Sequence, residues 1–294
     1  VINEFGQIGL DHRLVTQSED SATVVMDSGC ICCTIRTDLI QTLEQARWRF
    51  ARQGKRQFDH VVIETTGLAD PAPIIQTLAT EPRITRHYKL QSVVTTVDIL
   101  LGQNTLVEHM EAAKQVAMAD LLLLTKADLL AKNSSADNAL NAALEQLNPA
   151  VPKQIVSQGN APVHLLMANE AANPIDRWRQ SKTGAHGHGH DHGIGALCLV
   201  CAEPLAREAV EQWQQTVMTV LGADLFRLKA IVEVSGNQGP EWIVVQSVQH
   251  KAMPAERTGV TESVSSQFVL IGRNLTFDRV AATLTKAMPL SEAV

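Results

Sequence analysis

The feature that most constrains the fold is an alternation of short apolar runs with longer amphipathic segments over residues 1–168. The short runs predict strands over residues 23–26, 60–64, 92–98, 120–125 and 154–157. The amphipathic segments predict helices over residues 38–52, 72–79, 106–118 and 137–147. Strands that alternate with helices favour a mostly parallel sheet with helices on both faces. We therefore predict an α/β fold, in which ligands bind beyond the carboxyl ends of the strands.

Two changes of composition divide the rest of the chain. Residues 169–195 are rich in glycine and histidine, cannot pack a core and predict an exposed linker. Residues 196–294 predict a smaller α+β domain, with strands over 197–202, 226–234, 242–248 and 268–271 and helices over 205–221 and 277–288. The predicted domains are therefore 1–168 and 196–294, joined by the linker 169–195.

Charge and composition exclude several classes of protein. A net charge of −6 argues against a general nucleic-acid binder, and the basic run over residues 47–56 is interpreted as a solvated helix face. No apolar run approaches the roughly 20 residues that cross a bilayer, and the first residues have no signal-peptide pattern. Five cysteines with three clustered suit a reducing compartment. We expect a cytoplasmic protein that binds neither nucleic acid nor membrane.

The cysteine cluster is the most specific local motif. Residues 29–33 read Gly29-Cys30-Ile31-Cys32-Cys33, just after the predicted strand 23–26 and just before the predicted helix. Thiolates this close together can converge on one soft metal ion such as zinc. We predict a local metal site rather than part of a disulfide framework.

The other histidines and cysteines carry weaker signals. Four histidines alternate with small or polar residues in the linker, which fits either loose capture of zinc, nickel or cobalt or a polar linker with no metal role: His186, His188, His190 and His192. Cys198 and Cys201 lie three residues apart on a predicted strand and therefore point to opposite faces. We predict that these two cysteines are structural.

A buried strand that ends in an acidic residue marks the first nucleotide-binding pattern. Residues 61–67 read as an apolar run followed by Glu64-Thr65-Thr66-Gly67. In phosphate-handling proteins an acid at such a strand end supports a magnesium ion, and a glycine N–H approaches the terminal phosphate. Alone, the pattern is more often an ordinary turn.

The segment Thr125-Lys126-Ala127-Asp128 follows the apolar run at residues 121–124. An Asp at this place can accept two hydrogen bonds from the edge of guanine and so select GTP over ATP, while the lysine stem lies along the base. The alternative is a surface segment that starts the next helix. The nucleotide interpretation is favoured because Thr125–Asp128 follows Glu64 in the order, and at the distance along the sequence, expected of nucleotide-binding motifs.

Together these motifs resemble the CobW-type P-loop GTPase and metallochaperone family, whose members include metal-insertion chaperones. The resemblance covers nearly the whole chain and includes the second domain, which is similar to a CobW C-terminal domain. The segments that carry it are 3–6 with 9–11, 29–33, 64–71, 125–128, the His-rich linker, 226–229 and 268–273. The Cys-x-Cys-Cys motif between a switch-like segment and Glu-x-x-Gly is its most specific part.

The resemblance implies a P-loop NTPase-type sheet and a role for each motif. In the nucleotide site, Glu4 and Asp11 belong to the first switch, and Glu64 and Gly67 sense Mg²⁺ and the γ-phosphate. The guanine is read by three residues, with a threonine in place of the more common asparagine: Thr125, Lys126 and Asp128.

The resemblance also implies the cargo and the partner. Zinc, or else cobalt, is held by three thiolates: Cys30, Cys32 and Cys33. Hydrolysis of GTP changes the switch loops and drives delivery of the metal to a client apo-metalloenzyme. The resemblance allows a homodimer.

One departure from the family pattern affects the expected activity. The phosphate loop, Gly-x-x-x-x-Gly-Lys-Ser/Thr, belongs before residues 3–6, and the sequence contains no such motif. We expect an incomplete N-terminus, a full-length protein that is a GTPase, and poor GTP binding without hydrolysis by the chain as given. The alternatives are a zinc buffer or sensor without turnover and, ranked last, a thiol redox protein that uses Cys32 and Cys33.

Overall fold

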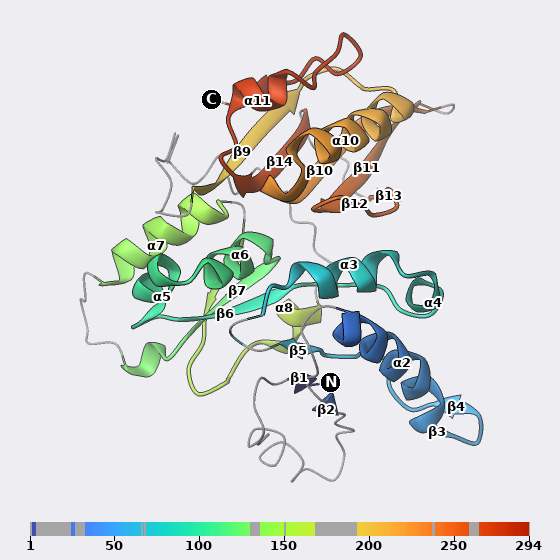
Figure 1. Cartoon of the computed structure of the whole chain (residues 1–294), viewed down its shortest axis with the longest axis vertical. Helices are drawn as coiled ribbons and strands as arrows, with labels where there is room; N and C mark the ends of the chain where they lie inside the picture. The colour runs from blue at the N-terminus through green and yellow to red at the C-terminus, as the bar shows by residue number, and fades with distance from the viewer. Residues whose placement is uncertain are drawn as a thin grey trace. The chain divides into compact units, whose positions relative to one another are not determined.

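The computed structural model (Figure 1) describes part of the chain, and its contacts divide the chain into two compact units, Val1–Leu90 and Gln91–Val294. The residues described are 2–3, 25–26, 33–65, 67, 69–129, 136–149, 151–167, 193–236, 239–258 and 265–293. Among them, no helix is long and apolar enough to cross a membrane. The domain boundaries expected from composition, near residues 168 and 195, stay a prediction.

The described residues of the first unit form a short parallel sheet, a hairpin and helices. The strands β1 (Ile2–Asn3), β2 (Val25–Met26) and β5 (Glu64–Thr65) pair in the order β2–β1–β5. The helices are α2 (Cys33–Arg49), α3 (Ala72–Thr80) and α4 (Pro82–Thr85). The hairpin joins β3 (Ala51–Arg52) to β4 (Lys55–Arg56).

The core of this unit lies between α2 and α4. Leu39, Ile40 and Leu43 of α2 are buried together with Ile84 of α4, a spacing that places them on one side of α2. The Tyr88 hydroxyl donates a hydrogen bond to the Leu43 carbonyl at 2.8 Å. The predicted helix is therefore real, and its apolar stripe forms the core.

The predicted end of that helix at residue 52 is wrong, because α2 ends at Arg49. Gln53 and Gly54 both adopt positive φ, 52° and 74°, which is the conformation of a two-residue hairpin turn. The last part of the basic run therefore lies on β3 and β4 rather than on a helix. The Gln-Gly pair was the signal that sequence reasoning missed.

The second unit begins with a parallel three-stranded sheet. The strands β6 (Val94–Asp98), β7 (Leu121–Thr125) and β8 (Lys153–Ile155) pair in that order. The accompanying helices are α5 (Gly102–Glu108), α6 (Met110–Met118), η1 (Ala127–Leu129), α7 (Ala136–Leu147) and α8 (Val163–Met167). The four leucines of β7 are buried, as befits a central parallel strand. The α/β fold class is confirmed.

The single helix predicted over 106–118 is two helices, with an extended residue, His109, between α5 and α6. The first of these starts earlier than predicted, at Gly102. Asp98 accepts hydrogen bonds from the backbone N–H groups of Leu100 and Leu101 and so fixes the turn that leads into α5.

The antiparallel sheet of the second unit and its helices correspond to the α+β part of the predicted fold. Its order is β12–β11–β10–β14–β9–β15, with β13 on β11. The strands are β9 (Ile194–Cys201), β10 (Leu225–Gly236), β11 (Gly239–Val248), β12 (Lys251–Ala252), β13 (Glu256–Arg257), β14 (Ser266–Arg273) and β15 (Ser291–Glu292). The helices are α10 (Arg207–Leu221), η2 (Gly222–Asp224) and α11 (Phe277–Ala281). A buried core lies between α10 and this sheet, where the rings of Trp213 and Phe268 pack edge to face at 5.2 Å.

The final predicted helix, 277–288, is wrong beyond Ala281. The Thr283 hydroxyl donates to the Val280 carbonyl at 2.6 Å and accepts from the Trp213 indole N–H at 3.0 Å. The backbone follows with tight turns at Thr283 and Leu284 instead of continuing the helix. A side chain that captures a backbone carbonyl competes with helix propagation.

Cys198 and Cys201 are free, buried thiols of β9, as predicted. Cys201 belongs to the core beneath α10, and Cys198 faces the other side of the sheet. Burial, together with the charge of Glu292, raises the pKa of Cys198 to about 12. The two cysteines are structural.

Candidate functional site

The carboxyl ends of β6 and β7 lie side by side and form the best-defined candidate site. The two strands pair in register up to Asp98 and Thr125. The Ile99 N–H donates to the Thr125 carbonyl at 3.1 Å, and the Thr125 hydroxyl donates to the Val97 carbonyl at 3.2 Å. These bonds fix the backbone where the predicted guanine-reading segment begins.

Lys126 leaves β7 in the left-handed region, with φ of 64°. Its ammonium group donates to Asp98 Oδ2 at 2.5 Å, while Asp98 Oδ1 accepts the N–H groups of Leu100 and Leu101. Burial tends to raise the pKa of Asp98, but the lysine and the two backbone donors outweigh it, and the pKa is lowered. Asp98 is therefore a carboxylate that holds Lys126 in place.

Asp128 lies in the short 3-10 helix η1 directly after Lys126, and its side chain is exposed. The turn is closed by a hydrogen bond of 3.0 Å from the Leu129 N–H to the Lys126 carbonyl. An exposed carboxylate on a fixed turn can accept two hydrogen bonds from one edge of a purine base. Thr125, Lys126 and Asp128 are thus brought together by the structure.

Asp98 was missed as a site residue. Its signal was the same as that of Glu64, an acidic residue at the end of a predicted strand. Sequence alone gave no way to see that its carboxylate oxygen meets Lys126, which directly follows the neighbouring strand β7.

Glu64 and Gly67 belong to the first unit. Glu64 is exposed in β5, and a Cβ added at Gly67 meets nothing within 4 Å. The predicted strand 60–64 is wrong over residues 60–63, because β5 begins at Glu64, where its pairing with β1 starts, and Val62 is 72% exposed. The Mg²⁺ and phosphate roles of Glu64 and Gly67 stay predictions.

Several predicted site residues lie outside the described part of the chain. Cys33 is the first residue of α2, and nothing is described of its side chain. The others outside the described residues are Glu4, Asp11, Cys30, Cys32, His186, His188, His190 and His192. Within the described part, no group of three or more His, Cys, Asp or Glu side chains is placed to hold a metal ion. The zinc site therefore stays a prediction.

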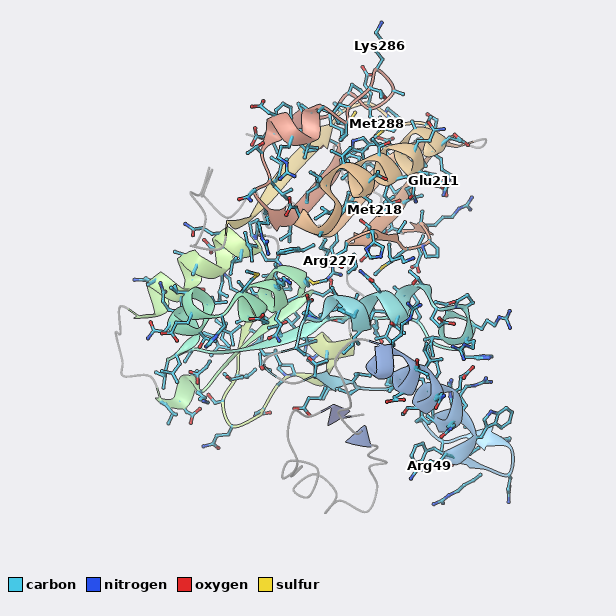
Figure 2. All side chains as sticks on the ribbon, in the orientation of Figure 1. Arg49, Glu211, Met218, Arg227, Lys286 and Met288 are labelled. Atoms are coloured by element: carbon cyan, nitrogen blue, oxygen red, sulfur yellow. The ribbon has the colours of Figure 1, made fainter. Side chains whose placement is uncertain are left out.

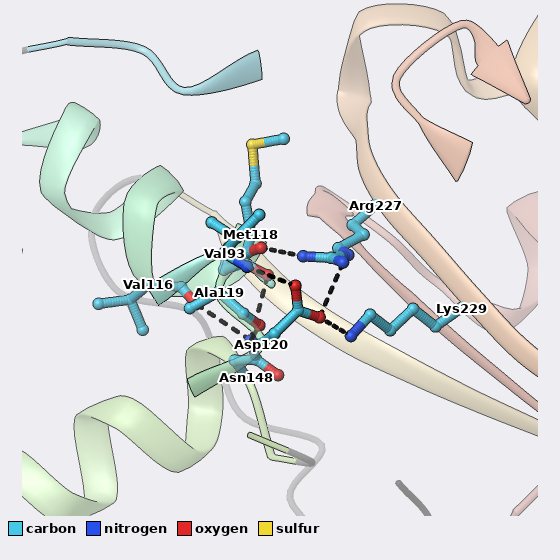
Figure 3. A network of polar contacts seen from close by, with 9 residues as sticks. Val93, Val116, Met118, Ala119, Asp120, Asn148, Arg227 and Lys229 are labelled. Carbon is cyan, nitrogen blue, oxygen red and sulfur yellow. Dashed lines mark hydrogen bonds and ion pairs between the residues drawn. The ribbon is translucent and has the colours of Figure 1, made fainter. Parts of the chain in front are cut away.

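A buried charge network at the other end of β7 was not predicted from sequence (Figure 3). Asp120 accepts hydrogen bonds from Arg227 at 2.8 Å and from Lys229, both on β10, and from the Val93 N–H at 2.8 Å. Arg227 also donates to the Met118 carbonyl at the end of α6. The side chains of Asp120 and Arg227 are only 20% and 4% exposed. The network joins the parallel sheet to the antiparallel one.

The charge state of Asp120 follows from its neighbours. Burial acts to raise its pKa, but the charges of Arg227 and Lys229 and the hydrogen bonds it accepts lower the pKa to about 2. Asn148 supports the same junction, since its buried amide donates to three carbonyls at the end of α6: those of Val116, Ala117 and Ala119. The strand that leads into the predicted guanine-reading segment is therefore fixed at both ends.

Comparison with known families agrees with this architecture. The model of the CobW/HypB/UreG nucleotide-binding domain matches residues 1–154, and that of the cobalamin synthesis protein cobW C-terminal domain matches residues 194–288. The chain belongs to the CobW/HypB/UreG family. The resemblance inferred from the motifs is confirmed.

Individual relatives extend the match over most of the chain. The zinc chaperone YjiA of Escherichia coli is 27% identical over 95% of this chain and 86% of its own length. The zinc chaperone CobW of Pseudomonas aeruginosa is 26% identical over 98% of this chain and 83% of its own length. The crystal structure of Zn(II)-bound YjiA GTPase from E. coli superposes with a TM-score of 0.61 at 25% identity, covering 84% of this chain and 74% of that one.

Proposed function

We propose that this protein is a GTP-dependent metallochaperone that binds zinc, or else cobalt, and delivers it to a client apo-metalloenzyme. The observation that carries the proposal is the fixed turn Thr125–Asp128, in which Lys126 is held by Asp98 at the carboxyl end of a central parallel strand. Relatives that match most of the chain are zinc chaperones, and one solved relative is a Zn(II)-bound GTPase.

The proposed nucleotide contacts fall into two sets, one for guanine and one for the phosphates and Mg²⁺. Asp128 would accept hydrogen bonds from the guanine edge, the Lys126 stem would lie along the base, and Thr125 would stand where asparagine is usual. Four further residues would interact with the phosphates and Mg²⁺: Glu4 and Asp11 of the first switch, and Glu64 and Gly67 of the second. Mg²⁺ prefers oxygen ligands, which fits these carboxylates.

Zinc is the proposed cargo. Three thiolates within four positions match the preference of zinc for sulfur ligands, and these would be Cys30, Cys32 and Cys33. The linker histidines, at 186, 188, 190 and 192, would raise the local metal concentration. Because the γ-phosphate and Mg²⁺ order switch loops and hydrolysis releases them, loops that carry the thiolates would change metal affinity with each turnover.

The proposed domains are a GTPase domain (1–168), a His-rich linker (169–195) and a C-terminal domain (196–294). The enzymatic activity that we propose for this family member is GTP hydrolysis. The sequence given contains no Gly-x-x-x-x-Gly-Lys-Ser/Thr motif, so we expect this chain to bind GTP poorly and not to hydrolyse it. That observation favours a second candidate for the chain as given, a zinc buffer or sensor without turnover.

A chelator-competition zinc titration tests the proposal, with and without Mg²⁺ and GTP, on the native chain and on Cys32→Ala. Tighter zinc binding with GTP that is lost in Cys32→Ala would support the switch-coupled chaperone and contradict the expected weak GTP binding. Binding through Cys32 that ignores GTP would support the buffer or sensor for this chain. Zinc binding that is unchanged by Cys32→Ala would refute the cysteine site.

A further inference from the structure

The end of α2 and the hairpin that follows it form an unusual surface, called here the basic tip: Arg47, Trp48, Arg49, Arg52, Lys55 and Arg56. Five of these six residues are cationic, and residues 47–56 contain no acidic residue. Figure 2 labels Arg49 at this end of α2, where side chains extend away from the ribbon. Taking these five positive charges from the net charge of −6 leaves −11 on the rest of the chain.

The tip has a defined shape. The Phe50 N–H donates to the Ala46 carbonyl at 3.1 Å, and the Gln57 N–H donates to the Phe50 carbonyl at 3.0 Å, so the hairpin is attached to the helix end. The rings of Phe50 and Phe58 pack edge to face at 6.5 Å. The guanidinium of Arg49 lies 5.7 Å from the Phe50 ring, and that of Arg56 lies 5.5 Å from the Phe58 ring. The charges are therefore presented on a packed support.

The positive charges are poorly compensated by the protein itself. Within the described residues, the only carboxylate paired with the tip is Asp59, 3.4 Å from Arg56, and this exposed ion pair contributes at most about 1 kcal/mol. Arg52 and Lys55 are directly opposite each other across the hairpin. Like charges opposite each other in a sheet are destabilising, and an anion bound between them would remove this cost.

A favourable interaction with the helix dipole explains only part of the basic tip. Basic residues in the last turn of a helix interact favourably with its dipole, which accounts for Arg47 and Arg49. It does not account for the cations of β3 and β4, which lie beyond the helix. Nor does it account for Trp48, which is 75% exposed with the Arg47 guanidinium 5.6 Å from its ring. Binding surfaces are enriched in tryptophan and arginine, and the basic tip contains both.

We infer that the basic tip is a docking surface for a short acidic segment of a partner protein, with one apolar residue of that segment against Trp48. The hairpin strands have two residues each, at about 3.3 Å per residue, so the tip accommodates only a few extended residues. The net charge of −11 on the rest of the chain disfavours a long polyanion. A short acidic segment neutralises the tip and avoids this repulsion.

The position of the tip links docking to the proposed cargo. The helix α2 has 17 residues and starts at Cys33, the last cysteine of the motif, so the tip lies about 25 Å along the helix from it at about 1.5 Å per residue. The identification of the docked partner with the client rests on the proposed function. The docking surface itself needs neither GTP nor zinc.

The test is fluorescence anisotropy of the full chain with a labelled acidic peptide in which glutamates flank one leucine, without nucleotide or metal. We expect saturable binding that weakens as salt is raised, and no binding of the same peptide with glutamine for each glutamate. The double variant R52E/K55E should weaken binding at least about tenfold, and Trp48→Ala about threefold to tenfold. Lys286→Glu, an exposed charge reversal in the second unit, is the matched control and should leave affinity unchanged.

Circular dichroism of each variant establishes that the fold is retained, because all substituted side chains are exposed. Equal binding of the glutamine peptide, or an unchanged affinity of R52E/K55E, would overturn the inference. Tighter binding of a DNA duplex or of phosphatidylserine vesicles through the same residues would also overturn it, since the partner would then be a different polyanion. Because GTP and zinc are absent, loss of the proposed chaperone function leaves this result intact.

Discussion

Replacing Asp120 with asparagine should destabilise the second unit by about 2–5 kcal/mol. The pKa of Asp120 is lowered from its ordinary value of 3.8 to about 2. This lowering of the pKa corresponds to a stabilisation of about 2 kcal/mol by the ionised carboxylate. The upper part of the range arises because the variant leaves Arg227 buried without its charge partner, a loss that typically costs about 3–5 kcal/mol.

The pH dependence of the stability provides an independent test of the role of Asp120. Because the folded pKa is lower than the unfolded one, the stabilisation by Asp120 is fully present above the unfolded value of 3.8 and is lost as the pH falls through about 2. The difference in free energy of unfolding between the native chain and Asp120→Asn should therefore be constant near neutral pH and shrink between about pH 5 and pH 2. Urea unfolding followed by tryptophan fluorescence measures it, since Trp213 is buried in the antiparallel domain.

Two controls make the test specific. Asp278→Asn removes an exposed carboxylate from the first turn of α11 and should cost only a few tenths of a kcal/mol. The double variant D120N/R227M should be more stable than the sum of the two single effects predicts, because it removes both members of the pair. A loss below about 1 kcal/mol for Asp120→Asn, or a pH-independent difference, would refute the reasoning.

Three further predictions concern packing and reactivity. Gly272→Ala should cost about 1–3 kcal/mol, because a Cβ there would meet the Asp224 carbonyl, whereas Gly195→Ala on the paired strand has open space and should be nearly neutral in thermal unfolding; equal effects would contradict this. Asn148→Ala should cost about 1–3 kcal/mol in urea unfolding, because it removes the donor to three carbonyls, while Asn138→Ala at an exposed position of α7, the helix that ends just before Asn148, should cost at most about 0.5 kcal/mol. Cys198 should resist iodoacetamide at pH 8 in the native chain and react in urea, as mapped by mass spectrometry; rapid native labelling would contradict its burial and its raised pKa.

The element types and the family of this protein were readable in the sequence. The hydrophobic patterns predicted the α/β and α+β parts, because a strand covered on both faces is continuously apolar, as β7 is, and a helix buries one stripe, as α2 does. The motifs at residues 29–33, 64–71 and 125–128, together with the other segments that carry the resemblance, predicted the family, because they depend on residue types at fixed spacing. Boundaries were less determined, as the ends of α2 and α11 show.

Only the tertiary structure decided which distant side chains meet. The contact of Asp98 with Lys126 depends on the pairing of β6 with β7, and that of Asp120 with Arg227 joins residues 107 positions apart. The basic run looked like one face of a helix until the turn at Gln53 and Gly54 folded half of it into a hairpin. Periodicity records which face of an element is buried, but the partner that covers this face is set by packing between elements, and so are the charges that become neighbours.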